Sequence, residues 1–593
     1  MSVIGQLSRL ESAGLVSLKA AHPEVEYLFR HALVHEAVYH SLLKHDRKQL
    51  HLATGETLER SVLPDAGRLD EFAPLLAQHF YEGGDDYRAL VYFLRAAMAA
   101  VRVYANAEAV AYYDRALEIA PRVAAGAVPW QEVYSSRGRA LELIGQYERA
   151  VGNYEAMEDE ARAQGDRELE LAALTARATL YATPTSVLDP EKGKALSHRA
   201  LALARERGNR PAEAKVLWVL MLAHYFSAKA DEAAPFGEQS LAIARELNLR
   251  EQMAFTLNDL THTYVAIGAH ERARAAEEES RRLWRDQGNL TMLTDNLASG
   301  ADHAYTAGEL DTSLRLSEEA YGLARTIGSA WGQCYSRWIA GYVHWERGDS
   351  GQAIACLEDA VALARLSGLV IVQSLPRIDL GLIYAELGAL ERGLGLAQEG
   401  LAFLQPSTPP VIQGWAWAAL ARLHVLRQDL PAASRAIEQR RRLPQIDDFS
   451  TPAPIMIALA EGEFHLAQND AEQAVAVATE IQAKMERYRI RAFMPPVLYL
   501  AGRALIALHR DDEARAALLE ARAEAEGRGS RFILWQILAE LADLESERGA
   551  QTQALAYRQQ ARDIIAEIAA RVPTAELRSS FLARPSVRAV LGA

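Results

Sequence analysis

The chain has 593 residues, of which 50% are apolar, and a formal net charge of −14. This length exceeds what one hydrophobic core can organise, so the chain is either multidomain or a stack of small repeated units. The acidic charge argues against a nucleic-acid surface, which needs clustered Lys and Arg to neutralise phosphates.

The cysteines and the N-terminus indicate the compartment. Cys334 and Cys356 are the two cysteines, too few for a disulfide framework or a thiolate metal site. The first residues contain no basic region followed by an apolar stretch, and no window approaches about 18 uninterrupted apolar residues. We therefore expect a cytoplasmic protein with buried free thiols and no membrane-spanning segment.

The first thirty or so residues differ from the rest of the chain. The stretch "IGQLSRLESAGLV" predicts a short amphipathic helix that ends at Gly14, because its apolar residues recur with helical spacing. The stretches "LVSL" and "EYLF" predict two strands joined by a proline-containing turn. This order of elements is typical of the back half of a winged helix.

A histidine-rich motif follows, in the order Phe29-x-His31-x-Leu33-x-x-Glu36-x-x-Tyr39 and then Arg47 to His51. It resembles the end of the winged-helix module in signal-transduction ATPases with numerous domains (STAND ATPases). The closest likeness is to bacterial members fused to class III adenylate or guanylate cyclases, and the activator of the maltose regulon is a related type. The C-terminal stretch "AELRSSFLARPSVRAVL" resembles the way those chains finish.

This resemblance implies a nucleotide role for one histidine. In the family, a histidine at the position of His31 senses the phosphates of the bound nucleotide, and a packing role is the alternative here. The chain departs from the family because its Gly193-Lys194 pair lacks the first glycine and the hydroxyl of G-x-x-x-x-G-K-[ST]. We therefore expect any ATPase or cyclase activity to lie in domains upstream of Met1.

A metal site is the other reading of these histidines. His31 and His35 lie four residues apart, on one helical face, and Glu36 follows. The stretch "HALVHE" is not the HExxH arrangement that supplies two zinc ligands and a base, so we expect no metal. We expect polar or packing positions on helices for His35, His40, His45 and His51.

Two interleaved series of glycines recur at steps of 40 residues. In one series each glycine lies in a tight turn between two predicted antiparallel helices: Gly268, Gly308, Gly348 and Gly388. The other series is offset by half a period and follows helices rich in Ala, Leu and Arg. It therefore marks helix C-caps, at Gly208, Asn248, Gly288, Gly328 and Gly368.

The unit is a pair of helices, and it resembles the tetratricopeptide repeat in its longer form of about forty residues. The stretch "GQYERAVGNYEA" carries the pattern best, with Gly138, Tyr147, Ala150 and Tyr154 in place. No unit can bury its apolar face alone, so the units must stack. The resemblance covers roughly residues 70–570 and implies an all-α fold, a right-handed α-α superhelix with a small N-terminal partial winged-helix segment.

The patterns divide the chain into four expected regions. These are a partial winged-helix segment at 1–60, irregular helical hairpins at 61–128, a regular superhelix at 129–570 and a C-terminal tail or cap at 571–593. Two longer connections, at 404–413 and 442–456, contain several prolines. They are either spacers or a second place for ligand contacts.

In a superhelix of this kind the first helix of each pair lines the concave surface. Aromatic rings supply contact area there and a few polar groups fix orientation, which suits a peptide, a helix or a small polar ligand. The same side chains could instead fill the space between neighbouring repeats. The expected groove consists of Trp218, Tyr225, Asn258, His262, Asp295, Asp302, Tyr305, Tyr335, Trp338, Tyr342 and Trp345.

No catalytic arrangement such as G-x-S-x-G stands out in the sequence, so we expect neither an enzyme nor a cofactor. Our first hypothesis is a noncatalytic protein-interaction and sensor arm of a bacterial cytoplasmic signal-transduction ATPase of the adenylate-cyclase-associated type. It would bind a protein, a peptide or a small ligand in the groove, with an ATPase or cyclase module as partner, and neither nucleic acid nor membrane. The alternatives are a small-ligand-sensing transcriptional regulator of the maltose-activator type without its DNA-binding domain, and a fragment of a nucleotide cyclase.

Overall fold

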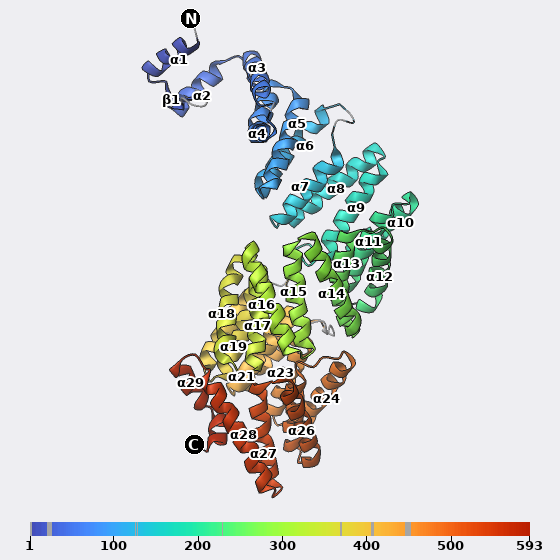
Figure 1. The fold of residues 1–593 in the computed structure, drawn as a ribbon, viewed down its shortest axis with the longest axis vertical. Helices are drawn as coiled ribbons and strands as arrows, with labels where there is room; N and C mark the ends of the chain where they lie inside the picture. Colours follow the sequence, from blue (N-terminus) through green and yellow to red (C-terminus); the bar gives the residue numbers. More distant parts are fainter. Residues whose placement is uncertain are drawn as a thin grey trace. The chain divides into compact units, whose positions relative to one another are not determined.

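The computed structural model describes residues 3–20, 26–63, 65–124, 126, 128–227, 229–367, 370–404, 408, 410–444 and 452–592. Most of these residues lie in helices (Figure 1). The chain forms two compact units, unit 1 at Met1–Asp189 and unit 2 at Pro190–Ala593. Parts of the proline-containing connections expected at 404–413 and 442–456 lie outside the described residues, at 405–407, 409 and 445–451.

Unit 1 begins with a helix, a two-stranded hairpin and a second helix: α1 (Val3–Ser12), β1 (Val16–Ala20), β2 (Glu26–Phe29) and α2 (Ala32–Ser41). The strands are antiparallel, with Val16 opposite Phe29. Gly14 has a φ of 72°, which lets the chain leave α1 and enter β1. The expected helix and strands are confirmed, whereas the expected turn at 21–25 lies outside the described residues. This segment is a small strand pair with flanking helices rather than a complete winged helix.

The rest of unit 1 is a succession of antiparallel helices: α3 (Lys44–Val62), α4 (Ala66–Gly83), α5 (Asp86–Arg102), α6 (Asn106–Ile119), the 3₁₀ helix η1 (Ala120–Arg122), α7 (Trp130–Leu143), α8 (Tyr147–Gln164) and α9 (Arg167–Ala182). Their apolar faces bury large side chains such as Phe80 and Tyr113. Gly138 on α7 is packed against Tyr154 on α8 so closely that a Cβ there would overlap the tyrosine ring. The small residue that the repeat pattern places at 138 therefore has a direct packing reason.

Unit 2 continues as paired helices. In the pairs, odd-numbered helices from α11 to α27 come first and even-numbered helices from α12 to α28 come second. The bounds are α10 (Pro190–Arg207), α11 (Arg210–Tyr225), α12 (Ala230–Glu246), α13 (Arg250–Ala266), α14 (His270–Gln287), α15 (Leu290–Thr306), α16 (Leu310–Ile327), α17 (Ala330–Glu346), α18 (Ser350–Ser367), α19 (Val370–Glu386), α20 (Leu390–Ala402), α21 (Pro410–Leu426), α22 (Leu430–Arg441), α23 (Ala453–Ala467), α24 (Ala471–Arg487), α25 (Met494–Ala507), α26 (Asp511–Arg528), α27 (Arg531–Glu547), α28 (Gln551–Ala570), α29 (Ala575–Leu582) and α30 (Pro585–Leu591).

Both glycine series fall at helix boundaries, as expected. The glycines of the first series lie between the two helices of a pair and have φ values of 73–85°: Gly268, Gly308, Gly348 and Gly388. The residues of the second series follow even-numbered helices, α10 to α16, and have φ values of 53–70°: Gly208, Asn248, Gly288 and Gly328. Gly368 lies outside the described residues. The left-handed backbone, which costs least for Gly and Asn, explains both series.

Close approach within a pair depends on small residues. A Cβ at Gly381 on α19 would lie 2.6 Å from the carbonyl oxygen of Gly393 on α20, so these two helices touch through their backbones. Buried side chains from Tyr305 to Val590 form one continuous apolar core, because each pair packs on the next. The expected all-α solenoid of tetratricopeptide-like hairpins is therefore confirmed.

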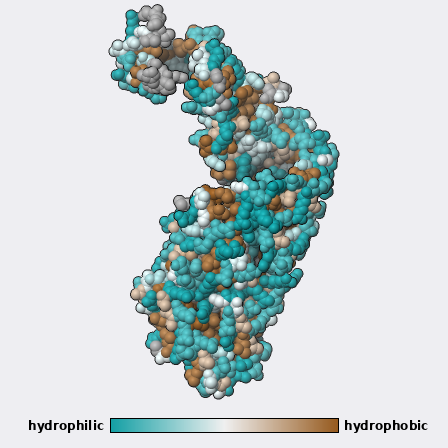
Figure 2. Space-filling model, in the orientation of Figure 1, coloured by the Kyte–Doolittle hydropathy of each residue, from teal (hydrophilic) through white to brown (hydrophobic). Residues whose placement is uncertain are grey.

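The N-terminal part of unit 1 exposes large apolar side chains, and Figure 2 shows brown areas among teal there. Leu33, Leu43 and Leu50 are 79%, 72% and 54% exposed, and α2 contains no buried residue. Clustered apolar exposure of this kind is typical of a surface that contacts another protein or domain.

Candidate functional site

Polar side chains link several first helices of unit 2 to the next first helix. The indole of Trp218 on α11 donates to Asp259 on α13 at 2.7 Å, and the two residues lie 41 positions apart, about one repeat. The same separation recurs in four more hydrogen-bonded pairs: Tyr305–Glu346, Trp338–Asp379, Arg422–Glu463 and Tyr499–Glu540. We call these five pairs, together with the eleven expected groove residues, the first-helix row.

The structure divides the eleven expected groove residues by exposure. Asn258, Tyr305 and Trp338 are 5%, 3% and 5% exposed, so they fill the space between neighbouring repeats. Burial favours the packing alternative for these three, and their role as ligand contacts stays a prediction. The other eight are partly exposed and stay predictions as ligand contacts: Trp218, Tyr225, His262, Asp295, Asp302, Tyr335, Tyr342 and Trp345.

Asp379 on α19 accepts hydrogen bonds from three side chains. Its Oδ2 accepts from Trp338 Nε1 at 2.8 Å and from the Tyr342 hydroxyl at 2.6 Å, and its Oδ1 accepts from Trp415 Nε1 at 3.1 Å. Burial raises the pKa of Asp379 to about 6, although the three hydrogen bonds act in the opposite direction. One buried carboxylate thus connects α17, α19 and α21.

A second group of carboxylates lies on α13 and α15. Burial raises the pKa values of Asp259, Asp295 and Asp302, that of Asp259 to about 7, and the Asp295 charge also raises the pKa of Asp259. Within the described ranges, no Lys or Arg forms an ion pair with these three carboxylates. Uncharged groups donate to them instead: Trp218 to Asp259, Asn258 and Trp331 to Asp295, and Tyr335 to Asp302.

Histidines lie beside these carboxylates. The ring of His262 on α13 lies 5.1 Å from that of His303 on α15, measured between centroids. Burial, with a smaller effect of His303, lowers the pKa of His262 to about 3, so His262 is neutral at pH 7. His303 Nδ1 lies 3.4 Å from Glu277 Oε2. His262 therefore adds no positive charge to this part of the row.

Charges are paired further along the row. Arg422 on α21 donates two hydrogen bonds to Glu463 on α23, at 2.8 and 3.0 Å. Glu540 on α27 accepts from the Tyr499 hydroxyl at 3.4 Å and lies 3.6 Å from Arg503 Nε. The row therefore has cation partners for its carboxylates on α23 and α27, but not for those on α13 and α15.

Sequence reasoning missed the acceptors of the row. Projecting the repeat onto one helix face identified three of the donors, Trp218, Tyr305 and Trp338, but it did not compare each donor with the residue one repeat later. A Trp, Tyr or Arg followed 41 positions later by Asp or Glu is the signal that would find them. The missed acceptors are Asp259, Glu346, Asp379, Glu463 and Glu540.

The histidine-rich segment of unit 1 makes local contacts. His31 is the N-cap residue of α2, and its side chain is exposed. His51 on α3 lies 3.0 Å from the Tyr39 hydroxyl and, through its other ring nitrogen, 3.0 Å from His79 Nδ1 on α4. Burial, followed by the effect of His51, lowers the pKa of His79. No group of three or more His, Cys, Asp or Glu suited to a metal ion occurs among the described residues.

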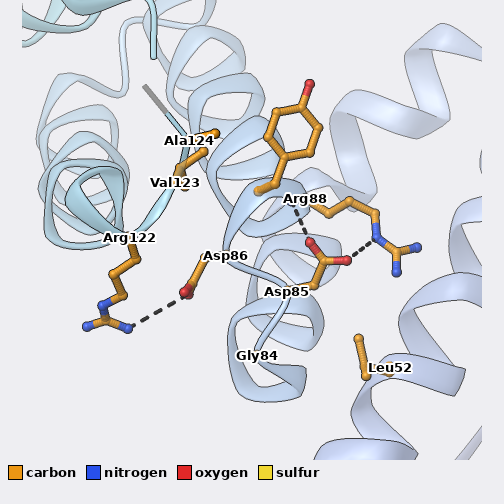
Figure 3. Close-up of a pocket in the computed structure, with 9 residues that line it drawn as sticks. Leu52, Gly84, Asp85, Asp86, Arg88, Arg122, Val123 and Ala124 are labelled. Atoms are coloured by element: carbon orange, nitrogen blue, oxygen red, sulfur yellow. Dashed lines mark hydrogen bonds and ion pairs between the residues drawn. The ribbon is translucent and has the colours of Figure 1, made fainter. Parts of the chain in front are cut away.

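A surface pocket of about 580 Å³ lies in unit 1, far in sequence from the first-helix row (Figure 3). Asp85 accepts from Arg88 Nε at 2.7 Å, and Arg122 lies 3.7 Å from Asp86. These charges pair with one another, so the pocket offers weaker electrostatic attraction to a ligand than the carboxylates of the row. Its lining also includes Leu52, Gly84, Tyr87, Val123 and Ala124.

Cys334 and Cys356 are buried free thiols, as expected. Burial raises the pKa of Cys334 to about 12 and that of Cys356 to about 11, so neither is a reactive thiolate at neutral pH. Among the helices described, none has the length and apolar character needed to cross a membrane.

The hairpins and their stacking define this chain as a tetratricopeptide-like repeat protein. No family model and no curated protein matches the chain. A Rap protein complexed with competence and sporulation factor is 11% identical, with a TM-score of 0.39, over 68% of this chain and 99% of that one. A STAND protein with a tetratricopeptide repeat sensor from Pyrococcus horikoshii is 15% identical, with a TM-score of 0.39, and the match covers 74% of this chain and 59% of that one. The Cut9–Hcn1 hetero-tetramer of APC/C matches at 11% identity and a TM-score of 0.44, and the match covers 88% of this chain and 97% of that one. Scores this low establish no shared function.

Proposed function

We propose that this chain is a noncatalytic interaction and sensor arm that binds its ligand at the first-helix row of unit 2. The observation that carries the proposal is the group of three desolvated carboxylates, Asp259, Asp295 and Asp302, which have hydrogen-bond donors but no ion-pair partner within the described ranges. Stacked helical hairpins present extended surfaces that proteins commonly use for recognition.

The chemistry of this part of the row favours a ligand that brings positive charge. The pKa values of the three carboxylates are raised because they lost water without gaining a cation, so a Lys, Arg or amine group would stabilise their charged forms. The rings of Trp218 and Tyr335 flank the same carboxylates and can contact a cation through their faces. A basic peptide segment or a small amine therefore fits better than an anionic ligand.

The N-terminal part supports a second contact, with a signalling ATPase. The motif from Phe29 to His51 resembles the end of a STAND winged-helix module, and α2 is exposed, with Leu33 in its first turn and Leu43 just beyond its end. We assign this apolar surface to the ATPase module of an adenylate-cyclase-associated system. His31, exposed at the start of α2, is the residue that would approach a nucleotide phosphate there.

Ligand binding is tested with labelled peptides of about twelve residues, basic or acidic, in fluorescence polarisation. The basic peptides are expected to bind and the acidic ones not. A triple variant with Asp259→Asn, Asp295→Asn and Asp302→Asn should weaken binding at least about tenfold, equivalent to 1.4 kcal/mol. The control is Asp311→Asn, because Asp311 is 98% exposed and pairs with Arg347 outside the row. Equal binding of both peptide classes, or an equal effect of the control, would contradict the proposal.

The ATPase contact is tested by titrating a separately produced STAND ATPase fragment with bound ATP, bound ADP or no nucleotide. We expect binding in one of these states, and loss of it in the double variant Leu33→Asp and Leu43→Asp. Leu555→Asp is the matched control, because Leu555 is 66% exposed on α28 in unit 2. An ATPase fragment that ignores the chain in every state would count against this part of the proposal.

A further inference from the structure

Unit 2 contacts itself across a long sequence separation. Turns between paired helices approach residues of the C-terminal third: Gly268 lies beside Arg487 and Tyr488, Gly308 beside Arg491 and Arg528, Gly348 beside Arg531 and Ile568, and Gly388 beside Ser580. The separation is 218 residues for the contact of His270 with Tyr488 and 198 residues for that of Arg584 with Glu386. Figure 1 shows the green and yellow helices of unit 2 against its orange and red ones. We call this self-contact the seam.

Backbone groups form much of the seam. The amides of Arg491 and Ala492 both donate to the carbonyl oxygen of Thr306, at 2.9 and 3.1 Å. The Arg528 guanidinium donates to the carbonyls of Arg491 and Ala492, the latter at 2.7 Å. The two amide bonds join the end of α15 to the segment between α24 and α25, so neighbouring repeats do not make them. The Arg528 bonds instead join the end of α26 to that same segment, within the C-terminal helices.

At the other end of the seam, Arg584 and Gly388 make the contact. The Arg584 guanidinium donates to the carbonyl of Glu386 and, at 2.9 Å, to its carboxylate. A Cβ at Gly388 would lie 2.5 Å from the carbonyl oxygen of Ser580, a backbone atom that a rotamer change cannot move. Glycine therefore suits this position in two ways, because it adopts the φ of 85° at the least cost and leaves room for the contact across the seam.

The seam is polar compared with the contacts inside each hairpin. Arg528 Nε and Nη2 are buried without a hydrogen-bond partner, which offsets part of what the other seam bonds contribute. Apolar contacts across it include Trp345 on Phe532, with ring centroids 3.7 Å apart, and Tyr305 on Phe493, with centroids 6.0 Å apart. The two helices of a pair bury continuous apolar faces against each other. We therefore expect the seam to open before the helices of any pair separate.

We propose that the seam is a latch that sets the curvature of unit 2. When it is closed, the turns after α13, α15, α17 and α19 rest on the C-terminal helices. When it opens, the solenoid uncoils while every hairpin stays folded. Tyr305 couples the latch to the ligand face, because it donates to Glu346 within the first-helix row and its ring contacts Phe493 across the seam.

Hydrogen exchange at the amides of Arg491 and Ala492 reports the latch directly, since both donate across it. The full chain carrying Gly388→Asn places a side chain against Ser580 at the far end of the seam. Asn tolerates the left-handed backbone, so this change adds bulk with little φ cost. We expect exchange at Arg491 and Ala492 to become at least about tenfold faster, with unchanged protection inside α13 and α15.

Gly549→Asn is the matched control, because Gly549 has a φ of 81° and nothing within 4 Å of a Cβ. A second pair is Arg584→Ala, which removes the bonds to Glu386, against Arg558→Ala, which removes a pair with Asp543 inside one hairpin. Both seam variants should speed exchange at the two amides, and both controls should not. Unchanged exchange in the seam variants, or loss of protection throughout α13 to α20, would overturn the proposal.

Discussion

The indole nitrogen of Trp338 lies 2.8 Å from the carboxylate of Asp379, one repeat further along the chain. Tyr342 and Trp415 donate to the same carboxylate, so one acceptor on α19 binds donors from α17 and α21. Such a group is costly to bury and costly to remove, because each partner has given up water to reach it. Asp379 is therefore a point where the packing of three repeats can be tested.

We predict that Asp379→Ala destabilises unit 2 by about 3–5 kcal/mol, because three donors, of which Trp338 and Trp415 are buried, lose their acceptor. Asp379→Asn should cost less, since its amide oxygen still accepts. Urea unfolding followed by tryptophan fluorescence measures both, because Trp338 and Trp415 are direct partners. Asp543→Ala, which removes an exposed ion pair with Arg558, should change stability by less than about 1 kcal/mol. A loss for Asp379→Ala no larger than that of the control would contradict the role of Asp379.

Asp259 makes stability depend on pH. Its pKa is about 7 in the folded chain against an ordinary 3.8, so the folded state holds the proton more tightly than the unfolded state. The resulting stabilisation is complete below about pH 4 and is lost as the pH rises through about 7. Asp259→Asn should remove this loss and raise stability at pH 8 by about 1–3 kcal/mol.

Melting curves between pH 5 and pH 8 test this prediction, and the difference between the native chain and the variant isolates Asp259 from other titrating groups. Asp286→Asn, at an exposed pair with Arg250, serves as control and should follow the native curve. Parallel curves for the native chain and Asp259→Asn would show that the carboxylate is not desolvated in solution.

Two glycines of unit 1 should respond in opposite directions to alanine. Gly138→Ala forces a Cβ into the ring of Tyr154 and should destabilise by about 1–3 kcal/mol. Gly152→Ala lies on the exposed face of α8 with nothing within 4 Å, and should stabilise by about 0.5–1 kcal/mol. Thermal unfolding of the two variants measures both effects. The same sign for both would contradict the close packing at Gly138.

Arg422 donates two hydrogen bonds to the carboxylate of Glu463, and this bidentate geometry predicts that lysine cannot replace Arg422. Arg422→Lys keeps the charge but loses one of the two hydrogen bonds, at a cost of about 1–2 kcal/mol. The control is Arg427→Lys, whose exposed pair with Glu391 at 3.3 Å should change stability by less than about 0.5 kcal/mol. The urea midpoints of unfolding measure both changes in stability. Equal shifts of the midpoint in the two variants would show that the bidentate geometry contributes nothing to stability.

The fold was largely accessible from the sequence because its information is local. A left-handed turn needs Gly or Asn, and a helix needs its apolar stripe, so Gly268, Gly308 and their equivalents marked the boundaries without knowledge of distant contacts. The first helix and the two strands of unit 1 were readable for the same reason. These signals each involve residues within one hairpin.

The candidate site could be predicted only in part from the sequence, because its residues form hydrogen bonds with partners one repeat away. Trp338 and Tyr305 were identified as aromatic groove positions. Only the exposed fraction of a side chain distinguishes packing between repeats from lining the groove, and that fraction depends on how the repeats stack. Asp379 and Asp259 look like ordinary solvated acids until their donors 41 positions earlier are considered. The seam was invisible to local patterns, since His270 meets Tyr488 only after 218 residues of accumulated curvature.

Because of that accumulated curvature, the seam contacts of unit 2 form only with a fixed number of hairpins between them. An open array of hairpins can gain or lose a member with little effect elsewhere, because each touches only its neighbours. Here one extra hairpin inserted after Gly388 would carry Arg584 past Glu386, and Thr306 would meet the wrong amides. The number of hairpins between the two edges is thus as much a part of this structure as any residue in it.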